Sequence, residues 1–400
     1  MARSFWILLA GLLGLGAAAL FLLRAEPAPL DTSVAVSEAM AGDTTGYRRA
    51  TTVRPFQFPE DHGPHPGYKT EWWYVTGNLS TANGRDVGYE LTLFRIAMAP
   101  PDAPSTRRAS TADPDTTAAP WATDQFYMGH FAISDVQRRV QPDAERFARA
   151  AAGLAGAQAD PLRVWLGPWS IASVDSARTF PLRLRAATDT MAIDVTLRPQ
   201  KPMVLQGNRG LSQKGPGRGN ASYYYSYTRL ATEGRVVTGG DTLAVTGLSW
   251  MDREWSTSAL GANQVGWDWF ALQLDSGYDL MYYQLRTASG RPSRFSEGAW
   301  VDPSAQKTSL TREEVALTVL DTWTTPDGAR TYPVTWRLQV PGQQLDLTVD
   351  ARFPNQELTT SVRYWEGAVR VTGTQGGVPV RGTGYVELTG YGEQTGRIAP

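Results

Sequence analysis

Two segments of the chain place carboxylic acids directly among tryptophans. Asp252 and Glu254 lie in the first segment and Asp268 lies in the second. The indoles beside these acids belong to Trp255, Trp267 and Trp269. Burial among indole rings raises the pKa of a carboxyl and keeps it protonated at neutral pH, while the ring faces stabilise positive charge on a substrate. These residue types therefore indicate general-acid chemistry on an apolar molecule.

The spacing of these acids limits how they can cooperate. In a β-strand Asp252 and Glu254 face the same side of the sheet, so both carboxyls can meet one cavity. Alternation puts the two tryptophans beside Asp268 on the opposite face, so Asp268 shares a cavity with them only at a bulge or a strand end. The alternative is that Asp252, Arg253 and Glu254 form an ion-pair network that closes a barrel. The neighbouring guanidinium would then lower the pKa of the carboxyls and favour their ionised form, which cannot donate a proton.

A further acid, Glu71, precedes an aromatic run in the same way. It is either the N-terminal counterpart of the other acids or a buried partner of Lys69 or an arginine. The candidate catalytic residues are therefore Asp268, Asp252, Glu254 and Glu71. The candidate ligand-binding residues are the neighbouring aromatics and one histidine, which is either a core residue or a base: Trp72, Trp73, Tyr74, His130, Tyr224, Trp255, Trp267 and Trp269.

The sequence contains few of the residues or motifs that several common kinds of site require. With no Cys and three His, and with His62 and His65 separated by a rigid Gly-Pro pair, we expect no metal centre and no cofactor. No Gly-x-Ser-x-Gly elbow supports a serine hydrolase. The glycine-rich segment 207–219 lacks the strand–loop–helix setting of a phosphate loop, and is either a solvated loop or a lid. A net charge of -1 predicts no nucleic-acid partner.

The elements that must position these residues are short strands. The chain has 14 Trp and 16 Tyr beside 39 Gly and 26 Pro, which is typical of antiparallel hairpins in an all-β protein. Only segments 142–159 and 311–320 have a helix-like composition.

An internal repeat indicates two related domains. Residues 72–95 and residues 267–286 each contain an aromatic strand, a turn, and a second strand with a Tyr-acid-Leu element that ends at Arg. Repeated supersecondary units of this kind predict two β domains. We place them at residues 47–230 and 231–400, with the boundary where Gly and Thr cluster.

The N-terminus predicts export. Arg3 precedes an uncharged run over residues 4–23, which is long enough to cross a bilayer as a helix. Residues 1–24 are therefore either a removed signal peptide or an uncleaved membrane anchor. Residues 25–46, rich in Ala, Pro, Ser and Thr, form a predicted flexible tether, and residues 99–123 a surface insertion.

Five ordered motifs resemble those of the AttH/CrtC family, which includes carotenoid 1,2-hydratase. They lie at residues 58–79, 127–132, 201–207, 221–226 and 249–270, and the resemblance spans about residues 47–395. It implies two lipocalin-like β-barrels packed together, a periplasmic or cell-envelope location, and hydrophobic or lipid-like ligands. The enzymatic relatives hydrate an isolated alkene of a carotenoid. Where those pigment hydratases have a His after the corresponding Asp, this chain has Arg253.

Two functions from different classes follow. The first is a binding protein that holds a lipid- or isoprenoid-like molecule at the cell envelope, anchored to the inner membrane if the N-terminal segment is retained. The alternative is a hydro-lyase similar to carotenoid 1,2-hydratase, in which a carboxylic acid protonates an isolated alkene and water is added.

Overall fold

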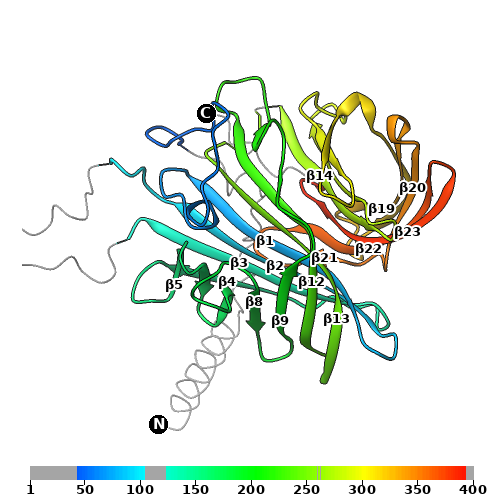
Figure 1. Ribbon diagram of the computed structural model, residues 1–400, viewed down its shortest axis with the longest axis horizontal. Coiled ribbons are helices and arrows are strands. Elements are labelled where there is room, and N and C mark those ends of the chain that lie inside the picture. Colours follow the sequence, from blue (N-terminus) through cyan, green and yellow to red (C-terminus); the bar gives the residue numbers. More distant parts are fainter. Residues whose placement is uncertain (1–42, 104–122, 259, 262, 393–400) are drawn as a thin grey trace, which may run out of the picture. The chain divides into compact units, whose positions relative to one another are not determined.

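The computed structural model describes residues 43–103, 123–258, 260–261 and 263–392, and the regular elements of these residues are almost all strands (Figure 1). The predicted signal or anchor, the tether up to residue 42 and most of the 99–123 insertion lie outside the described residues. Within the described part of the chain, no helix is long and apolar enough to span a membrane. Three short 3-10 turns interrupt the strands: η1 (Glu60–His62), η2 (Arg312–Glu314) and η3 (Pro341–Gln343).

The first sheet is antiparallel, in the spatial order β4-β3-β2-β1-β13-β12-β9-β8-β7-β6-β5, and β10 and β11 pair with β12. Its strands are β1 (Thr70–Ser80), β2 (Asp86–Ala97), β3 (Gln125–Asp135), β4 (Asp143–Arg149), β5 (Ala155–Gln158), β6 (Arg163–Leu166), β7 (Trp169–Ser173), β8 (Leu182–Ala187), β9 (Ala192–Pro199), β10 (Val204–Leu205), β11 (Leu211–Gln213), β12 (Ala221–Thr238) and β13 (Asp241–Ser256).

The second sheet has the order β17-β16-β15-β14-β23-β22-β20-β19-β18, with β21 paired to β22. Its strands are β14 (Gln264–Leu274), β15 (Asp279–Thr287), β16 (Glu297–Val301), β17 (Lys307–Thr311), β18 (Ala316–Thr324), β19 (Thr331–Val340), β20 (Leu345–Ala351), β21 (Glu357–Leu358), β22 (Tyr364–Gln375) and β23 (Val378–Leu388).

The two sheets repeat one topology. In each, the first strand pairs on one side with the second strand and on the other with the last strand, as β1 does with β2 and β13, and β14 with β15 and β23. The strand order on either side of this junction also corresponds. The repeat seen in the sequence is therefore confirmed as the β1–β2 and β14–β15 hairpins of two barrel-like sheets.

The division between the sheets differs from the one placed at residues 230 and 231, which falls inside β12. β12 and β13 form one long hairpin of the first sheet, so the chain changes sheet between Ser256 and Gln264. The cluster of Gly and Thr marks the turn of this hairpin, where Gly239 and Gly240 adopt φ values of 54° and 84° that favour glycine.

Neither segment with helix-like composition forms an α-helix, so that prediction was wrong. Residues 142–159 contain β4 and β5, and residues 311–320 contain η2 and the start of β18. Ala144 and Ala148 of β4 pack against the core of the first sheet while the strand pairs with β3. Sheet pairing and packing override the weak helix propensity of these alanines.

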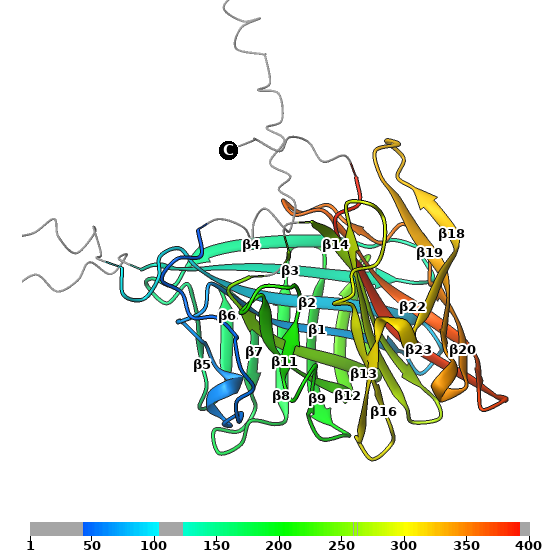
Figure 2. The same cartoon turned by 90° about the horizontal axis from the view of Figure 1, so that it is seen from above.

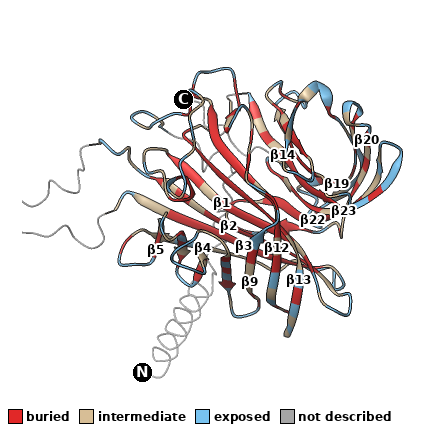
Figure 3. Cartoon of the chain, viewed as in Figure 1, coloured by how far each residue is buried: buried red, intermediate tan, exposed pale blue. Residues whose placement is uncertain are grey.

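Burial distinguishes strands at the junction from strands at the periphery. β8 alternates buried and exposed residues, as a strand with one solvated face does. β1, β2 and β3 are buried along most of their length (Figure 3), because one face covers the core of the first sheet and the other meets the second sheet (Figure 2). A third cluster of aromatic residues, including Tyr74, Trp250 and Trp269, fills the space between the sheets.

Candidate active site

A cavity of about 110 Å³ lies between the two sheets. The strands that contribute its walls are central to each sheet, and most of the side chains that line it are aromatic or apolar. These include Trp72, Tyr74, Phe94, Met128, Tyr224, Trp267, Trp269, Tyr283, Leu285 and Tyr364. Among these walls lie the carboxyls of Glu71, Asp252, Glu254 and Glu387 and the ammonium of Lys214.

Asp252 is held in this cavity by three donors. The hydroxyl of Ser226 (2.5 Å) and the indole N–H of Trp250 (2.7 Å) donate to Oδ1, and the hydroxyl of Tyr224 (2.5 Å) donates to Oδ2. Burial raises the pKa of Asp252 to about 7 although these three hydrogen bonds oppose the shift, and the negative charge of Glu254 adds to it. Asp252 is therefore a carboxyl that can exchange a proton near neutral pH.

Glu387 is a second carboxyl of this kind. The indole N–H of Trp267 donates to its Oε2 at 3.1 Å, and within the described residues its other oxygen forms no hydrogen bond. Burial raises the pKa of Glu387 to about 7; the hydrogen bond from Trp267 opposes this, and the charges of Glu254 and Asp252 add to it. The cavity therefore holds two carboxyls whose pKa values lie close together and near neutrality.

Glu254 lies in the same cavity and forms an ion pair with Lys214. Its Oε1 is 3.4 Å from the Lys214 Nζ. On β13 Asp252 and Glu254 share the cavity face, as the sequence predicted, while Arg253 points to the opposite face. The expected network of Asp252, Arg253 and Glu254 is therefore not formed, because strand alternation separates the guanidinium from both acids.

Asp268 does not line the cavity, although it was a candidate catalytic acid. It is buried on the other face of β14, where Arg286 donates to it at 2.9 Å and Tyr391 donates at 2.9 Å. β14 is regular at this position, so alternation turns Trp267 and Trp269 to the cavity and Asp268 away from it. Asp268 is part of the packing inside the second sheet.

Six of the predicted ligand-binding residues line the cavity: Trp72, Tyr74, His130, Tyr224, Trp267 and Trp269. Both ring nitrogens of His130 are occupied, by the Tyr364 hydroxyl at 2.7 Å and by Glu145 at 3.0 Å. The other two, Trp73 and Trp255, face away from the cavity, because they alternate with Trp72 and Glu254 on their strands.

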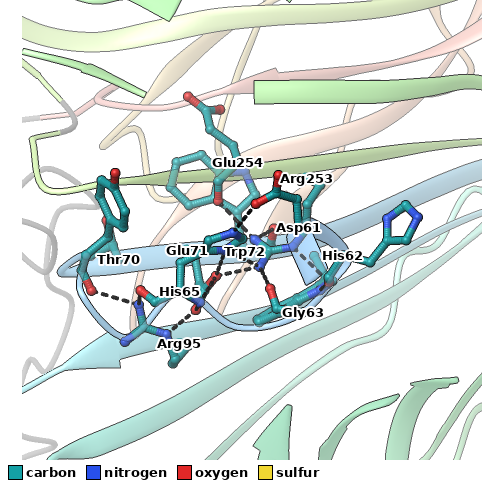
Figure 4. A network of polar contacts seen from close by, with 12 residues as sticks. Asp61, His62, Gly63, His65, Thr70, Glu71, Trp72, Arg95, Arg253 and Glu254 are labelled. Carbon is teal, nitrogen blue, oxygen red and sulfur yellow. Dashed lines mark hydrogen bonds and ion pairs between the residues drawn. The ribbon is translucent and has the colours of Figure 1, made fainter. Parts of the chain in front are cut away.

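Glu71 borders the cavity as part of a buried ionic network (Figure 4). Arg95 and Arg253 both donate to its carboxylate, and His65 Nδ1 lies 3.1 Å from it. Burial raises the pKa of Glu71, but the two guanidinium groups outweigh burial and hold it well below its usual range. Glu71 is therefore ionised at neutral pH, and of the partners that the sequence left open, arginine supplies the opposing charge.

The match to known families follows the chain almost from end to end. The family model described as AttH-like covers residues 49–391. The chain belongs to the AttH-like family. The resemblance carried by the five sequence motifs is thus confirmed.

Solved AttH-like structures have the same fold. A crystal structure of an AttH protein from Nitrosomonas europaea is 32% identical, with a TM-score of 0.72 over 86% of this chain and 99% of that chain. Kievitone hydratase from Nectria haematococca is 18% identical, with a TM-score of 0.62 over 86% of this chain and 96% of that chain, and shows the shared fold.

One curated relative is the dehydratase asqC from Emericella nidulans. It is 22% identical over 229 residues, which are 52% of this chain and 60% of that protein. This chain therefore matches less than two thirds of the length of that relative.

The sequence did not indicate two polar residues of this cavity, Lys214 and Glu387. Lys214 lies in the glycine-rich segment 207–219, for which a solvated loop and a lid were the alternatives, and it is buried beside the cavity. Glu387 follows Tyr385-Val386, but the sequence analysis recognised a Tyr-acid-Leu element only in the second strand of each repeat. The closing strand of each sheet carries an acid too, and comparison of β13 with β23 would have located Glu387.

Proposed function

We propose that the protein is a hydro-lyase, which adds water to a hydrophobic substrate or removes water from it in the cavity between the two sheets. The observation that carries this proposal is the pair of buried carboxyls, Asp252 and Glu387, whose pKa values are both raised to about 7 in a cavity with aromatic walls. Gain or loss of water needs one group that gives a proton and one that takes a proton.

The hydrogen bonds favour different roles for the two acids. Asp252 accepts three hydrogen bonds, which stabilise its ionised form, whereas Glu387 accepts one. Because the charge of ionised Asp252 raises the pKa of Glu387, ionisation of Asp252 favours the protonated form of Glu387 near neutral pH. In the proposed mechanism for loss of water, Glu387 donates the proton and Asp252 accepts one, and addition of water reverses these roles.

The walls of the cavity suit an apolar substrate. Trp72, Trp267 and Trp269 supply rigid apolar surface, and the cavity volume of about 110 Å³ suits a ring-sized group. Tyr74 belongs to the same wall, and its hydroxyl donates to Glu366 at 2.7 Å, which fixes its position. We expect the rest of a larger substrate to extend beyond the cavity.

Two relatives support addition or removal of water as the function. The sequence had placed ligand binding alone first, with the hydro-lyase as the alternative. The proteins named kievitone hydratase and dehydratase asqC are named for gain or loss of water. A simple carrier has no need for several buried carboxyls, since burial of ionisable groups is costly. Export to the cell envelope remains part of the proposal, and rests on residues 1–24.

Isotope incorporation tests the proposed function. The purified protein would be incubated in heavy-oxygen water with a panel of apolar alkenes, and with alcohols in the reverse direction, and products analysed by mass spectrometry. We expect labelled alcohol from the wild type and none from Asp252→Asn or Glu387→Gln, while Asp194→Asn, at an exposed ion pair, serves as the control. Equal labelling by the wild type and both acid variants would overturn the assignment.

A further inference from the structure

Lys214 places a positive charge in a cavity whose other ionisable groups are mainly acids. The residue follows β11 and is 8% exposed. Its backbone is fixed on both sides: the N–H donates to the Asn220 carbonyl at 2.8 Å, and its carbonyl accepts from the Gln264 side chain at 2.8 Å. The ammonium is therefore held at the cavity by a well-anchored segment.

The surroundings of the ammonium stabilise a cation but leave donors available. Its Nζ lies 3.8 Å from the centre of the Tyr283 ring and 5.3 Å from that of Tyr224, both of which line the cavity. The Glu254 carboxylate lies 3.4 Å away, farther than the usual charge-assisted hydrogen bond of about 2.8 Å. Within the described residues Nζ makes no hydrogen bond, so its donors can serve a ligand in the cavity.

A cation at this place favours one of two mechanisms by which water can be added or removed. Protonation of an isolated alkene creates a carbocation, which a nearby ammonium repels. Loss of water next to a carbonyl group instead builds negative charge on the carbonyl oxygen, which an ammonium stabilises. The fixed charge of Lys214 therefore favours a substrate whose reaction develops an anion.

We infer that the substrate carries a carbonyl group, that this carbonyl is conjugated with the double bond that gains or loses water, and that Lys214 binds the carbonyl oxygen. This inference rests on the proposed hydro-lyase function and names its substrate class, a β-hydroxy carbonyl compound and the corresponding unsaturated carbonyl compound.

The atoms balance with groups already in the cavity. In dehydration, the Asp252 carboxylate takes the proton from the carbon between the carbonyl and the carbinol, and the electron pair moves to the carbonyl oxygen beside Lys214. That pair then returns to form the carbon–carbon double bond as the carbon–oxygen bond breaks, and Glu387 protonates the departing hydroxide to give water. Hydration is the reverse, and no other reactant is needed.

The test compares two substrates, the wild type and three variants. Benzalacetone is an unsaturated ketone, while prenylbenzene has an isolated double bond and no carbonyl. The double variant Lys214→Met with Glu254→Gln removes the ammonium without leaving an unpaired buried carboxylate, and Lys214→Arg keeps a cation. The control, Arg198→Met with Glu233→Gln, removes an exposed ion pair. Circular dichroism and denaturant midpoints establish that each variant is folded.

We expect hydration of benzalacetone by the wild type, a loss of about 100-fold or more in kcat/KM for the Lys214→Met, Glu254→Gln double variant, and partial activity for Lys214→Arg. The control should match the wild type. Turnover of prenylbenzene without turnover of benzalacetone would overturn the inference and leave the hydro-lyase function standing. Equal kcat/KM for benzalacetone in the wild type and the double variant would overturn it as well.

A binding measurement separates this inference from the proposed function. If the wild type turns over neither substrate, the hydro-lyase proposal fails, and quenching of tryptophan fluorescence by benzalacetone still reports on carbonyl binding. Binding that weakens at least about tenfold in the double variant would support the contact with Lys214. Binding that is the same in both proteins, or absent from the wild type, would overturn it.

Discussion

Asp252 and Glu387 occupy corresponding positions in the two sheets. Asp252 lies opposite Tyr74 across the β1–β13 pair, and Glu387 lies opposite Trp269 across the β14–β23 pair. In each case the acid is on the closing strand and its aromatic partner on the first strand. Each sheet thus supplies one acid and one aromatic wall to the shared cavity, so the proposed catalytic pair requires both sheets.

The pH dependence of kcat/KM should be bell-shaped with its maximum near pH 7. Asp252 and Glu387 both have a pKa of about 7, and turnover requires one ionised and one protonated carboxyl. Below this range both are protonated and the base is lost; above it both are ionised and the acid is lost. Initial rates across the pH range with a saturable apolar substrate would check this. A flat profile would contradict the acid pair.

Asp252→Asn and Glu387→Gln should each reduce turnover by a factor of about 100 to 10,000, because each removes one proton-transfer group. For loss of water, Glu387→Gln should also remove the limb of the profile at high pH, which belongs to the acid in that direction. If Asp252→Asn instead removes the limb at high pH, the roles of Asp252 and Glu387 are the reverse of those proposed.

For loss of water, Trp267→Phe should move the limb at high pH upward. The indole N–H of Trp267 donates to Glu387 at 3.1 Å and lowers its pKa, so removal of this donor allows burial to raise the pKa further, by up to about one unit. Trp72→Phe, which changes the cavity wall but no bond to Glu387, is the matched control. A downward shift, or equal shifts in both variants, would count against Glu387 as the acid.

The sequence predicted strands, their repeat and part of the cavity wall, because these depend on local patterns. Alternation along β13 correctly placed Asp252 and Glu254 on one face, and the repeat located both first hairpins. Asp268 shows the limit of local reasoning. Its indole neighbours suggested a catalytic acid, and the same alternation that put them at the cavity turned Asp268 away from it.

The two site residues that the sequence did not indicate, Glu387 and Lys214, reach the cavity through contacts between distant segments. Glu387 reaches the cavity because β23 closes the second sheet against β14, and Lys214 because its segment packs against Tyr283 and Gln264. Neither contact follows from residue spacing. The charge state of Glu71 likewise follows from Arg95 and Arg253, which sheet pairing brings together.

Asp268→Asn should reduce stability and spare activity. The substitution removes the charge that Arg286 and Tyr391 contact inside the second sheet, and hydrogen bonds to charged groups contribute about 1.5 to 3 kcal/mol. Denaturant midpoints would measure the loss, with Asp194→Asn as the control, because the exposed Asp194–Arg183 pair should contribute at most about 1 kcal/mol. Loss of turnover without loss of stability would return Asp268 to the catalytic site.

Removal of residues 1–42 should leave the midpoint of unfolding unchanged. The described fold engages the segment beyond this point at Tyr47, whose hydroxyl donates to the Ala97 carbonyl at 2.8 Å, and at Arg48, whose N–H donates to the Gly67 carbonyl at 2.8 Å. Removal of residues 1–56 should destabilise the protein, because Arg54 pairs with Asp61 and Phe56 packs against Trp255. Equal midpoints for both truncations would contradict this.

Cell fractionation of the full chain would test the proposed export. Retention in the membrane fraction would indicate an anchor, and release into the periplasmic fraction would indicate a removed signal.

Glu71→Gln should destabilise the protein most at neutral pH. The carboxylate contacts two buried guanidinium groups, and loss of one partner in a buried ionic group costs about 3 to 5 kcal/mol. Its folded pKa lies well below its ordinary value, so its contribution is complete above the unfolded pKa and is lost as the pH falls through the folded pKa. Urea unfolding at about pH 7, 5 and 3 should therefore show a gap between wild type and variant that narrows on acidification. A gap that stays constant with pH would mean that Glu71 does not act as a buried anion, and that its amide disturbs packing alone.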